Sequence, residues 1–302
     1  MKKTILTVCA LLLTLCTLTV AIVAAPAVAG RKTCTAYIAD IRIDGKIDDA
    51  WAYAPEIPVN VVKENASAWF GDSSKVAGED YATLNCKVLW NGKDTLYVLF
   101  VVVDDKISMV GDNDWLNDSI ELFVQIDNEA EDSSVGKIQQ RWFADGSANG
   151  HDNEAGFSQN GSTLIFEVGF DVSEVTGGNY IGIDFQYNDD AEGNGERNVC
   201  LGWSDTVDKA SSDCTVYGQC ELSDVTVEGM IAAEKAAAEK AAAEKAAAEK
   251  AAAEKATAEA AAAAETVVAE TVVTSPKTAD AVVIAAIAAI VSGAGYMAAK
   301  KH

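Results

Sequence analysis

Short apolar runs separated by polar turns fill residues 34–227, and this pattern limits the possible folds more than any other feature. Residues 81–90 and 95–103 have the length and the β-branched and aromatic content of strands. Asn-Gly-Lys-Asp at 91–94 lies between them and is a strong hairpin signal. Further strand-like runs occupy residues 119–126, 164–170, 181–187 and 199–203. Many short strands without a long amphipathic helix predict an all-β domain over 30–228: an antiparallel, jelly-roll-like β-sandwich.

The composition changes abruptly after Gly229. Residues 231–258 repeat Ala-Ala-Ala-Glu-Lys with one Thr variant, and alanine continues to 264. Because alanine has the highest helix propensity, residues 229–264 are expected to form one helix roughly 50 Å long. A five-residue repeat turns the charges around the helix and leaves no apolar seam, which argues against a coiled coil. We interpret this segment as a semi-rigid spacer and residues 265–274 as a polar linker.

The N-terminus has the three parts of a secretory signal peptide. Lys2 and Lys3 are followed by an apolar run over residues 5–25, and Ala-Val-Ala at 27–29 precedes Gly30. We therefore expect residues 1–29 to be removed on export. The apolar run is long for a signal peptide, so an uncleaved membrane anchor is the alternative.

A second apolar segment, residues 281–297, lies close to the C-terminus and ends before Lys300 and Lys301. Together with Ala298 and Ala299 it has roughly 19 residues, which as a helix would span about 28 Å, enough to cross most of a membrane core. The closing lysines resist translocation, so the segment predicts a cytoplasmic C-terminus and an extracellular domain. Contact with the membrane is expected only through this segment.

A five-residue motif, Ser275, Pro276, Lys277, Thr278 and Ala279, directly precedes that segment. Motif, apolar stretch and basic tail together resemble the sortase sorting signals of Gram-positive surface proteins. The resemblance implies that sortase cuts after Thr278 and joins it to peptidoglycan, with Pro276 setting the bend before it. A plain transmembrane anchor is the alternative for residues 275–302. Either interpretation places the domain outside the cell, at its surface, and the sortase resemblance implies a Gram-positive bacterium.

The chain is strongly acidic, with a formal net charge of −23. Nucleic acids and anionic lipid head groups require a basic face, so the charge argues against both as partners. It suits calcium, whose ligands are carboxylate and amide oxygens. The acidic turns at 152–154 and 188–194 are the candidates, with ordinary solvated turns as the alternative.

Five cysteines remain in the expected exported domain: Cys34, Cys86, Cys200, Cys214 and Cys220. Export permits disulfides, and an odd number leaves one free thiol. Cys34–Cys220 is a candidate pair if the first and last strands are neighbours, and Cys200–Cys214 could close a loop. No C-x-x-C pair is present to predict a structural zinc site.

Four landmarks follow one another along the domain. They are Ile-Asp-Gly-Lys-Ile-Asp-Asp-Ala-Trp at 43–51, Val-Leu-Trp at 88–90, Asp-Trp-Leu-Asn-Asp-Ser-Ile-Glu-Leu-Phe at 114–123, and Trp-Ser-Asp at 203–205. Together with Tyr-Gly at 217–218 they resemble the family 9 carbohydrate-binding modules over about residues 36–222. These modules are β-sandwiches attached to xylanases and other surface proteins. The resemblance implies a polysaccharide-binding domain without a catalytic region, and a role for bound calcium.

The resemblance also implies the residues that contact sugar. Members that bind sugar hold the end of a chain between two tryptophans, with charged residues bonded to hydroxyls. By position, Trp115 is the first tryptophan, Glu121 the acidic partner and Arg141 the arginine on a following strand. The chemistry is sound, because an indole covers the C–H face of a pyranose while a carboxylate and a guanidinium bond its hydroxyls.

The second tryptophan of the family is absent. Its expected position, eight residues after Trp203, holds Ser211, so weaker binding is expected. Trp142 or Trp69 could supply a replacement wall, and Trp142 is the weaker fourth candidate for sugar contact. The remaining tryptophans are expected in the core or in packing positions: Trp51, Trp90 and Trp203.

A histidine-based catalytic centre is not expected. His151 is the only histidine outside the C-terminal tail, and it lies in a loop rich in glycine and asparagine. We therefore predict a non-catalytic surface protein that tethers xylan or β-glucan fragments through Trp115. The alternatives are an adhesin or scaffold subunit with a protein partner, and a haem- or metal-dependent electron carrier. The second would have to use His151 with Met109 or Met230.

Overall fold

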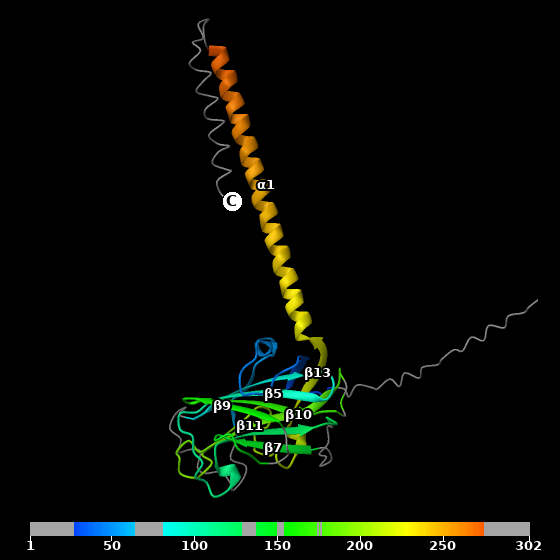
Figure 1. Cartoon of the computed structure of the whole chain (residues 1–302), viewed down its shortest axis with the longest axis vertical. Coiled ribbons are helices and arrows are strands. Elements are labelled where there is room, and N and C mark those ends of the chain that lie inside the picture. The colour runs from blue at the N-terminus through cyan, green and yellow to red at the C-terminus, as the bar shows by residue number, and fades with distance from the viewer. Residues whose placement is uncertain are drawn as a thin grey trace, which may run out of the picture. The chain divides into compact units, whose positions relative to one another are not determined.

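The computed structural model describes residues 27–63, 81–128, 137–149, 154–173, 175 and 177–274. The chain divides into two compact units, Met1–Ala232 and Ala233–His302. The first unit contains a 13-stranded sheet, part of which is labelled in Figure 1. Its strands are β1 (Thr33–Ile38), β2 (Ile57–Val59), β3 (Val61–Val62), β4 (Thr83–Trp90), β5 (Thr95–Val103), β6 (Ser119–Gln125), β7 (Lys137–Phe143), β8 (Ala148–Asn149), β9 (Ala155–Asn160), β10 (Thr163–Asp171), β11 (Tyr180–Asp189), β12 (Val199–Gly202) and β13 (Gly218–Thr226). Among the described residues, three short 3-10 helices join them: η1 (Asp49–Tyr53), η3 (Asp114–Leu116) and η4 (Cys214–Val216).

The strands pair in the order β8-β7-β6-β11-β13-β1-β4-β5-β10-β9, with β2, β3 and β12 off this path. The predicted all-β domain is confirmed, and so is the hairpin of β4 and β5 across Asn91. The prediction of purely antiparallel pairing is wrong for β1, which pairs in parallel with both β13 and β4. The first strand is inserted between the last strand and β4, and this position joins the two halves of the sheet.

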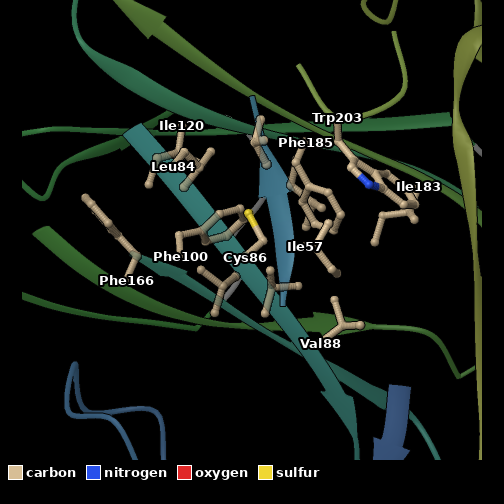
Figure 2. Packing of buried hydrophobic residues seen from close by; sticks show 14 of the residues in the cluster. Ile57, Leu84, Cys86, Val88, Phe100, Ile120, Phe166, Ile183, Phe185 and Trp203 are labelled. Atoms are coloured by element: carbon tan, nitrogen blue, oxygen red, sulfur yellow. The ribbon is translucent and has the colours of Figure 1, made fainter. Parts of the chain in front are cut away.

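The two halves of the sheet pack against each other, as in a β-sandwich. Phe100 on β5 contacts Trp142 on β7 with ring centroids 5.9 Å apart, and Phe185 on β11 at 6.1 Å. Neither pair of strands is hydrogen-bonded, so these contacts cross the core rather than run along the sheet. Figure 2 shows Phe100 and Phe185 with Cys86 and Trp203 in this cluster. The alternation predicted for residues 119–126 is explained by the core, because Ile120, Leu122 and Val124 face it.

The motif at 43–51 forms a turn that encloses the carboxylate of Glu167. This side chain of β10 is fully buried, and its Oε2 accepts the backbone N–H groups of Asp44, Gly45 and Lys46 at 3.1, 3.0 and 3.2 Å. Its Oε1 accepts the indole N–H of Trp51 at 2.9 Å. Gly45 has a φ of 75°, and a Cβ there would lie 2.7 Å from the backbone of Phe157. Turn and buried tryptophan are therefore fixed by one carboxylate.

The second unit, as far as it is described, is helical. Helix α1 (Val227–Thr274) has 48 residues, about 72 Å at 1.5 Å per residue. The helix does not end at 264 as expected, because residues 265–274, the predicted polar linker, continue it. Lys-to-Glu ion pairs at i,i+4 occur at Lys240–Glu244, Lys250–Glu254 and Lys255–Glu259, at 3.8 to 3.9 Å. No helix within the described ranges is long and apolar enough to cross a membrane.

The five cysteines of residues 30–228 are buried, and no disulfide joins any two of them. Cys34 and Cys220 are direct partners in the register of β1 and β13, so the expected neighbourhood is confirmed, although no disulfide joins them. The Cys200–Cys214 prediction is wrong. Cys200 lies on β12 with its sulfur near Asn188, whereas Cys214 lies on η4 in a separate apolar cluster with Phe123.

Several predictions concern residues outside the described ranges. These are the signal peptide up to residue 26, the sorting motif and apolar segment at 275–302, Trp69, His151 and the first two residues of the acidic turn at 152–154. They remain predictions.

Candidate functional site

A cavity of about 520 Å³ lies on the face of β6, β7 and β11 that points away from the core. This volume is in the range of small-ligand sites. Its lining comes from the three strands, from η3 and from the loops before and after β12. The lining residues are Trp115, Glu121, Gln139, Arg141, Gln186, Arg197, Asp208, Ser211 and Ser212.

The floor is a row of polar side chains across three neighbouring strands. Glu121 on β6 is the register partner of Arg141 on β7 and of Gln186 on β11. Because successive side chains on a strand alternate between the two faces, the neighbours of Glu121 face the core while Glu121 faces the cavity. The sheet register therefore brings together three residues from separate parts of the sequence.

Trp115 forms one wall of the cavity from the single turn of η3. The loop before it is closed by Asn117, whose side chain accepts from the N–H of Gly111 at 2.9 Å and donates to the carbonyls of Gly111 and Asn113. A Cβ at Gly111 would lie 2.6 Å from Leu116, so the loop approaches η3 too closely for another residue type. Trp115 is half-buried, which leaves part of the indole toward the cavity.

Glu121 is a buried but ionised acceptor. Burial favours the protonated form, but the charge and hydrogen bond of Arg141 at 2.8 Å, with hydrogen bonds from Asn188 and Gln139, hold the pKa of Glu121 below its ordinary value. Oε1 accepts from Arg141, Asn188 and Gln186, and Oε2 accepts from Gln139. One carboxylate is thus fixed by four donors at the floor of the cavity.

A second ion pair lies beside the first. Arg197 donates to Asp208 at 2.6 Å and to the side-chain oxygen of Asn188 at 3.0 Å. Because a guanidinium can only donate, it fixes the orientation of the Asn188 amide, whose N–H₂ group then faces Glu121 at 2.6 Å. The four charged side chains of the cavity thus form two ion pairs, Glu121–Arg141 and Asp208–Arg197, and their net charge is zero. An uncharged polar ligand would therefore meet fixed donors and acceptors.

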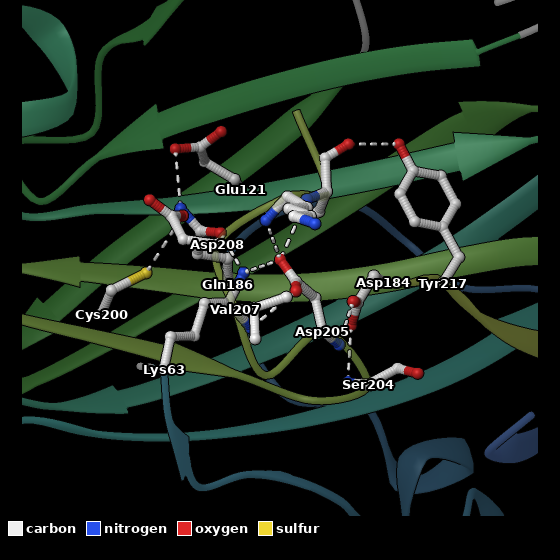
Figure 3. A network of polar contacts seen from close by, with 12 residues as sticks. Lys63, Glu121, Asp184, Gln186, Cys200, Ser204, Asp205, Val207, Asp208 and Tyr217 are labelled. Atoms are coloured by element: carbon white, nitrogen blue, oxygen red, sulfur yellow. Dashed lines mark hydrogen bonds and ion pairs between the residues drawn. The ribbon is translucent and has the colours of Figure 1, made fainter. Parts of the chain in front are cut away.

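The loop from Trp203 to Tyr217 supplies the opposite wall and is held by two buried carboxylates. Asp184 accepts the N–H groups of Ser204 and Asp205 at 2.9 and 2.8 Å. Asp205 in turn accepts the N–H groups of Val207, Lys209 and Ala210. Figure 3 shows Asp184 and Asp205 side by side beneath the site. The backbone that carries Asp208 and Ser211 is therefore fixed from below.

A family profile described as "Carbohydrate family 9 binding domain-like" matches residues 43–225, more than half of the chain. The chain belongs to this family. Its residues 43–225 are thus a carbohydrate-binding domain, which confirms the resemblance drawn from the four landmarks.

Relatives of this family 9 domain occur inside larger enzymes. Exoglucanase XynX of Acetivibrio thermocellus is 31% identical over 192 residues, which cover 60% of this chain and 16% of that protein. Endo-1,4-beta-xylanase A of Thermoanaerobacterium saccharolyticum is 28% identical over 192 residues, 60% of this chain and 15% of that protein. This chain thus spans less than a fifth of either relative.

Solved structures show the same fold. A family 9 module from Caldicellulosiruptor kristjanssonii in complex with glucose superposes with a TM-score of 0.55 at 17% identity, over 65% of this chain and 97% of that chain. A structure of a module from the same organism in complex with cellotriose gives a TM-score of 0.55 at 17% identity, over 65% of this chain and 95% of that chain.

In this family 9 domain the cavity brings together three of the four expected sugar-contact residues, Trp115, Glu121 and Arg141. The prediction that Trp142 contacts sugar is wrong, because its side chain is 1% exposed and packs in the core. The reason is strand alternation, because Arg141 faces the cavity and its neighbour must face the other side. The other core predictions are confirmed for Trp51, Trp90 and Trp203.

Ser211 lies on the rim of the same cavity as Trp115, exposed to solvent. The position at which the family resemblance implies a second tryptophan therefore holds a small hydroxyl side chain. The sequence did not predict several lining residues, because nothing in their spacing distinguishes them. Two are amides, two form the second ion pair, and one is a loop serine. They are Gln139, Gln186, Arg197, Asp208 and Ser212.

Three buried carboxylates of the family 9 domain form a separate cluster. Oxygens of Asp104, Asp118 and Asp189 lie within 4.8 Å of one another. Burial and the neighbouring carboxylates raise the pKa of Asp118 to about 8 and that of Asp189 to about 7, although backbone N–H groups oppose both shifts. One oxygen of Asp189 is buried without a hydrogen bond.

This cluster fits a calcium ion, since Ca²⁺ takes carboxylate oxygens and would neutralise the repulsion. Of the predicted turn at 188–194, Asp189 belongs to the cluster. Asp190 instead accepts the hydroxyl of Ser108 and, within its own loop, the backbone N–H groups of Asn194 and Gly195. Asp104 and Asp118 were not predicted as ligands.

Proposed function

We propose that this chain displays a non-catalytic saccharide-binding domain at the cell surface, where it holds fragments of plant polysaccharide such as xylan or β-glucan. The observation that carries the proposal is a half-buried indole at Trp115 beside the Glu121–Arg141 ion pair, in one cavity. A sugar has an apolar C–H face and a rim of hydroxyls. The indole suits the face, and the fixed carboxylate and guanidinium suit the hydroxyls.

The class of sugar rests on the relatives. They are named as an exoglucanase and as xylanases, and solved family 9 modules hold glucose and cellotriose. The paired charges of the cavity favour a neutral saccharide over an anionic one. Glucose, cellotriose and xylotriose are therefore the first ligands to test.

Replacing Trp115 by alanine tests the site. Removing roughly 100 Å² of indole contact should cost about 2.5 kcal/mol, or roughly 70-fold in affinity, measured by titration calorimetry. Val110→Ala is the matched control, because Val110 is exposed near η3 and does not line the cavity. Equal affinity of Trp115→Ala and wild type for every bound saccharide would overturn the site. If the wild type bound no saccharide, a protein partner would become the better explanation.

We propose that residues 229–302 hold the domain away from the membrane and attach it to the surface. The Ala-rich repeat, the motif at Ser275–Ala279 and the apolar segment support this, together with the signal-like N-terminus. Thr278→Ala tests the attachment. If sortase acts, the variant should move from the cell-wall fraction to the membrane fraction. An unchanged membrane location would support a plain anchor, and recovery of the wild type in the cytosol would overturn surface display.

We also propose that Asp104, Asp118 and Asp189 hold a structural calcium ion. The buried oxygen of Asp189 without a hydrogen bond supports this. Calorimetric titration with calcium should give one strong site in the wild type and none in Asp189→Asn. Equal binding by both would overturn the assignment.

A further inference from the structure

One buried lysine lies beneath the cavity without lining it. Lys63 directly follows β3, and its backbone N–H bonds the carbonyl of Cys200 on β12 at 2.9 Å. Its side chain is 0% exposed, and its stem passes close to Gly202, where a Cβ would lie 2.5 Å from Lys63 Cε. The ammonium is therefore held in one place (Figure 3).

Lys63 is charged despite its burial. Burial alone would lower its pKa, but the neighbouring Cys200, Asp205 and Asp184 outweigh this and raise the pKa of Lys63 above its ordinary value. Its Nζ donates to Oε1 of Gln186 at 2.5 Å and to Oδ2 of Asp205 at 2.8 Å. One cation thus contacts both the floor of the cavity and the loop that forms its wall.

The bond to Gln186 decides which way that amide points. An ammonium only donates, so Gln186 must turn its oxygen toward Lys63. Its N–H₂ group then faces the cavity side, where it donates to Glu121 at 3.3 Å and to Asn188 at 2.8 Å. Without Lys63 the amide is free to turn over and place its oxygen against the carboxylate of Glu121.

The bond to Asp205 fixes the opposite wall. The same Oδ2 that accepts from Lys63 accepts the N–H groups of Lys209 at 2.7 Å and Ala210 at 2.9 Å. Ala210 directly precedes Ser211 on the rim. Loss of the cation would leave Asp205 buried without a counterion and loosen this backbone.

We propose that Lys63 is a positioning residue for saccharide binding: it sets the donor side of Gln186 and the backbone of the Ser211 wall without touching the ligand. This rests on the proposed function of the cavity. The positioning role of Lys63 can fail while the cavity still binds saccharide, so the experiments can tell the two failures apart.

A double-mutant cycle tests the proposal with cellotriose as the probe. Lys63→Met and Gln186→Met should each weaken binding by about tenfold, and the double variant by little more than either, because both remove one interaction. Lys87→Met is the matched control and should bind like the wild type. Lys87 is a half-buried lysine, and its Nζ bonds only the carbonyl of Trp51 at 3.0 Å among the described contacts. Independent, additive losses or an unweakened Lys63→Met would overturn the inference.

A measurement on the wild type keeps the test valid if Lys63→Met fails to fold. In a nitrogen NMR titration with cellotriose, the Lys63 ammonium signal should shift with the same saturation as the Trp115 indole signal. The Lys87 signal should stay in place. A Lys63 signal that does not move while Trp115 saturates would overturn the inference alone. A wild type that binds no saccharide would overturn the proposed function as well.

Discussion

Replacing Asp189 by asparagine should stabilise the metal-free domain near pH 8 and abolish its stabilisation by calcium. In the wild type, Oδ2 of Asp189 accepts the N–H of Ala82 at 2.7 Å, while Oδ1 is buried without a hydrogen bond near Asp104 and Asp118. In the variant the amide oxygen can keep the Ala82 bond. The N–H₂ group then takes the place of the other oxygen and donates to the remaining carboxylates. One substitution thus removes a repulsion and a proposed calcium ligand together.

The magnitude follows from the pKa values. The pKa of Asp189 is raised from 3.8 to about 7 and that of Asp118 to about 8, mainly by burial. A carboxyl group whose pKa is raised on folding stabilises the fold while it is protonated. That stabilisation is lost as the pH rises through the folded pKa. For one such proton, the free energy of unfolding should fall by roughly 4 kcal/mol between about pH 4 and pH 7. The two groups interact, so their separate losses do not add.

Calcium should reverse this dependence, because it binds the ionised carboxylates. With a dissociation constant of about 10 μM, about 1 mM calcium would add roughly 2.7 kcal/mol at neutral pH. Carboxylates with lowered pKa values, such as Glu121 and Asp205, lose their contribution only as the pH falls through their folded pKa. The loss of stability from these carboxylates therefore occurs at more acidic pH and does not mask the loss expected from Asp118 and Asp189.

Urea unfolding in EDTA or calcium, from about pH 5 to about pH 8, measures both effects. Asp112→Asn is the matched control, since Asp112 is an exposed carboxylate outside the cluster. The reasoning would be refuted if the metal-free wild type became more stable toward pH 8. It would equally be refuted if Asp189→Asn kept the full calcium response.

Three further predictions concern the cavity and the core. Ser211→Trp should restore a second wall and tighten saccharide binding by about tenfold in calorimetry, whereas Thr215→Trp, at an exposed position outside the cavity, should leave affinity unchanged. Trp142→Ala should lower the free energy of unfolding in urea by about 3–5 kcal/mol, because it empties a core position; a loss below about 1 kcal/mol would contradict its burial. Glu167→Gln should destabilise the domain by about 1–3 kcal/mol, because an amide has one acceptor oxygen and cannot accept all four N–H groups equally well. An unchanged midpoint of urea unfolding would contradict the claim that this carboxylate fixes the turn at 43–51.

Local patterns predicted the strands and part of the site. The hairpin across Asn91 follows from turn chemistry, and the strand at 119–126 follows from alternation. Trp115, Glu121 and Arg141 were found only because they lie at positions that match a family motif. Alternation alone would also have excluded Trp142, because Arg141 and Trp142 are adjacent on one strand and cannot share a face.

Contacts between distant parts of the chain were not predictable in the same way. Gln186 reaches the cavity through the register of β11 with β6, and no local pattern sets that register. The same holds for Asp104, Asp118 and Asp189, which lie near the ends of three different strands and meet only after the sheet has formed. Helix α1 was underestimated for another reason. Its valine- and threonine-containing end has lower helix propensity than the alanine repeat, but it continues a helix that is already formed.

Burying charged side chains beneath the cavity costs free energy, and a contribution to stability does not explain why they are there. Lys63, Asp184 and Asp205 are almost fully removed from solvent, and well-packed apolar residues would often be equally stable or more stable in such places. What apolar residues cannot do is dictate the direction of an amide or hold the backbone of a loop by its N–H groups. The cavity needs both, because hydroxyl groups are recognised by the direction of each donor and acceptor. The charge pairs are therefore best understood as a support that orients neutral hydrogen-bonding groups before a saccharide arrives. Substitutions beneath the cavity should therefore weaken saccharide binding even though the substituted residues do not touch the ligand.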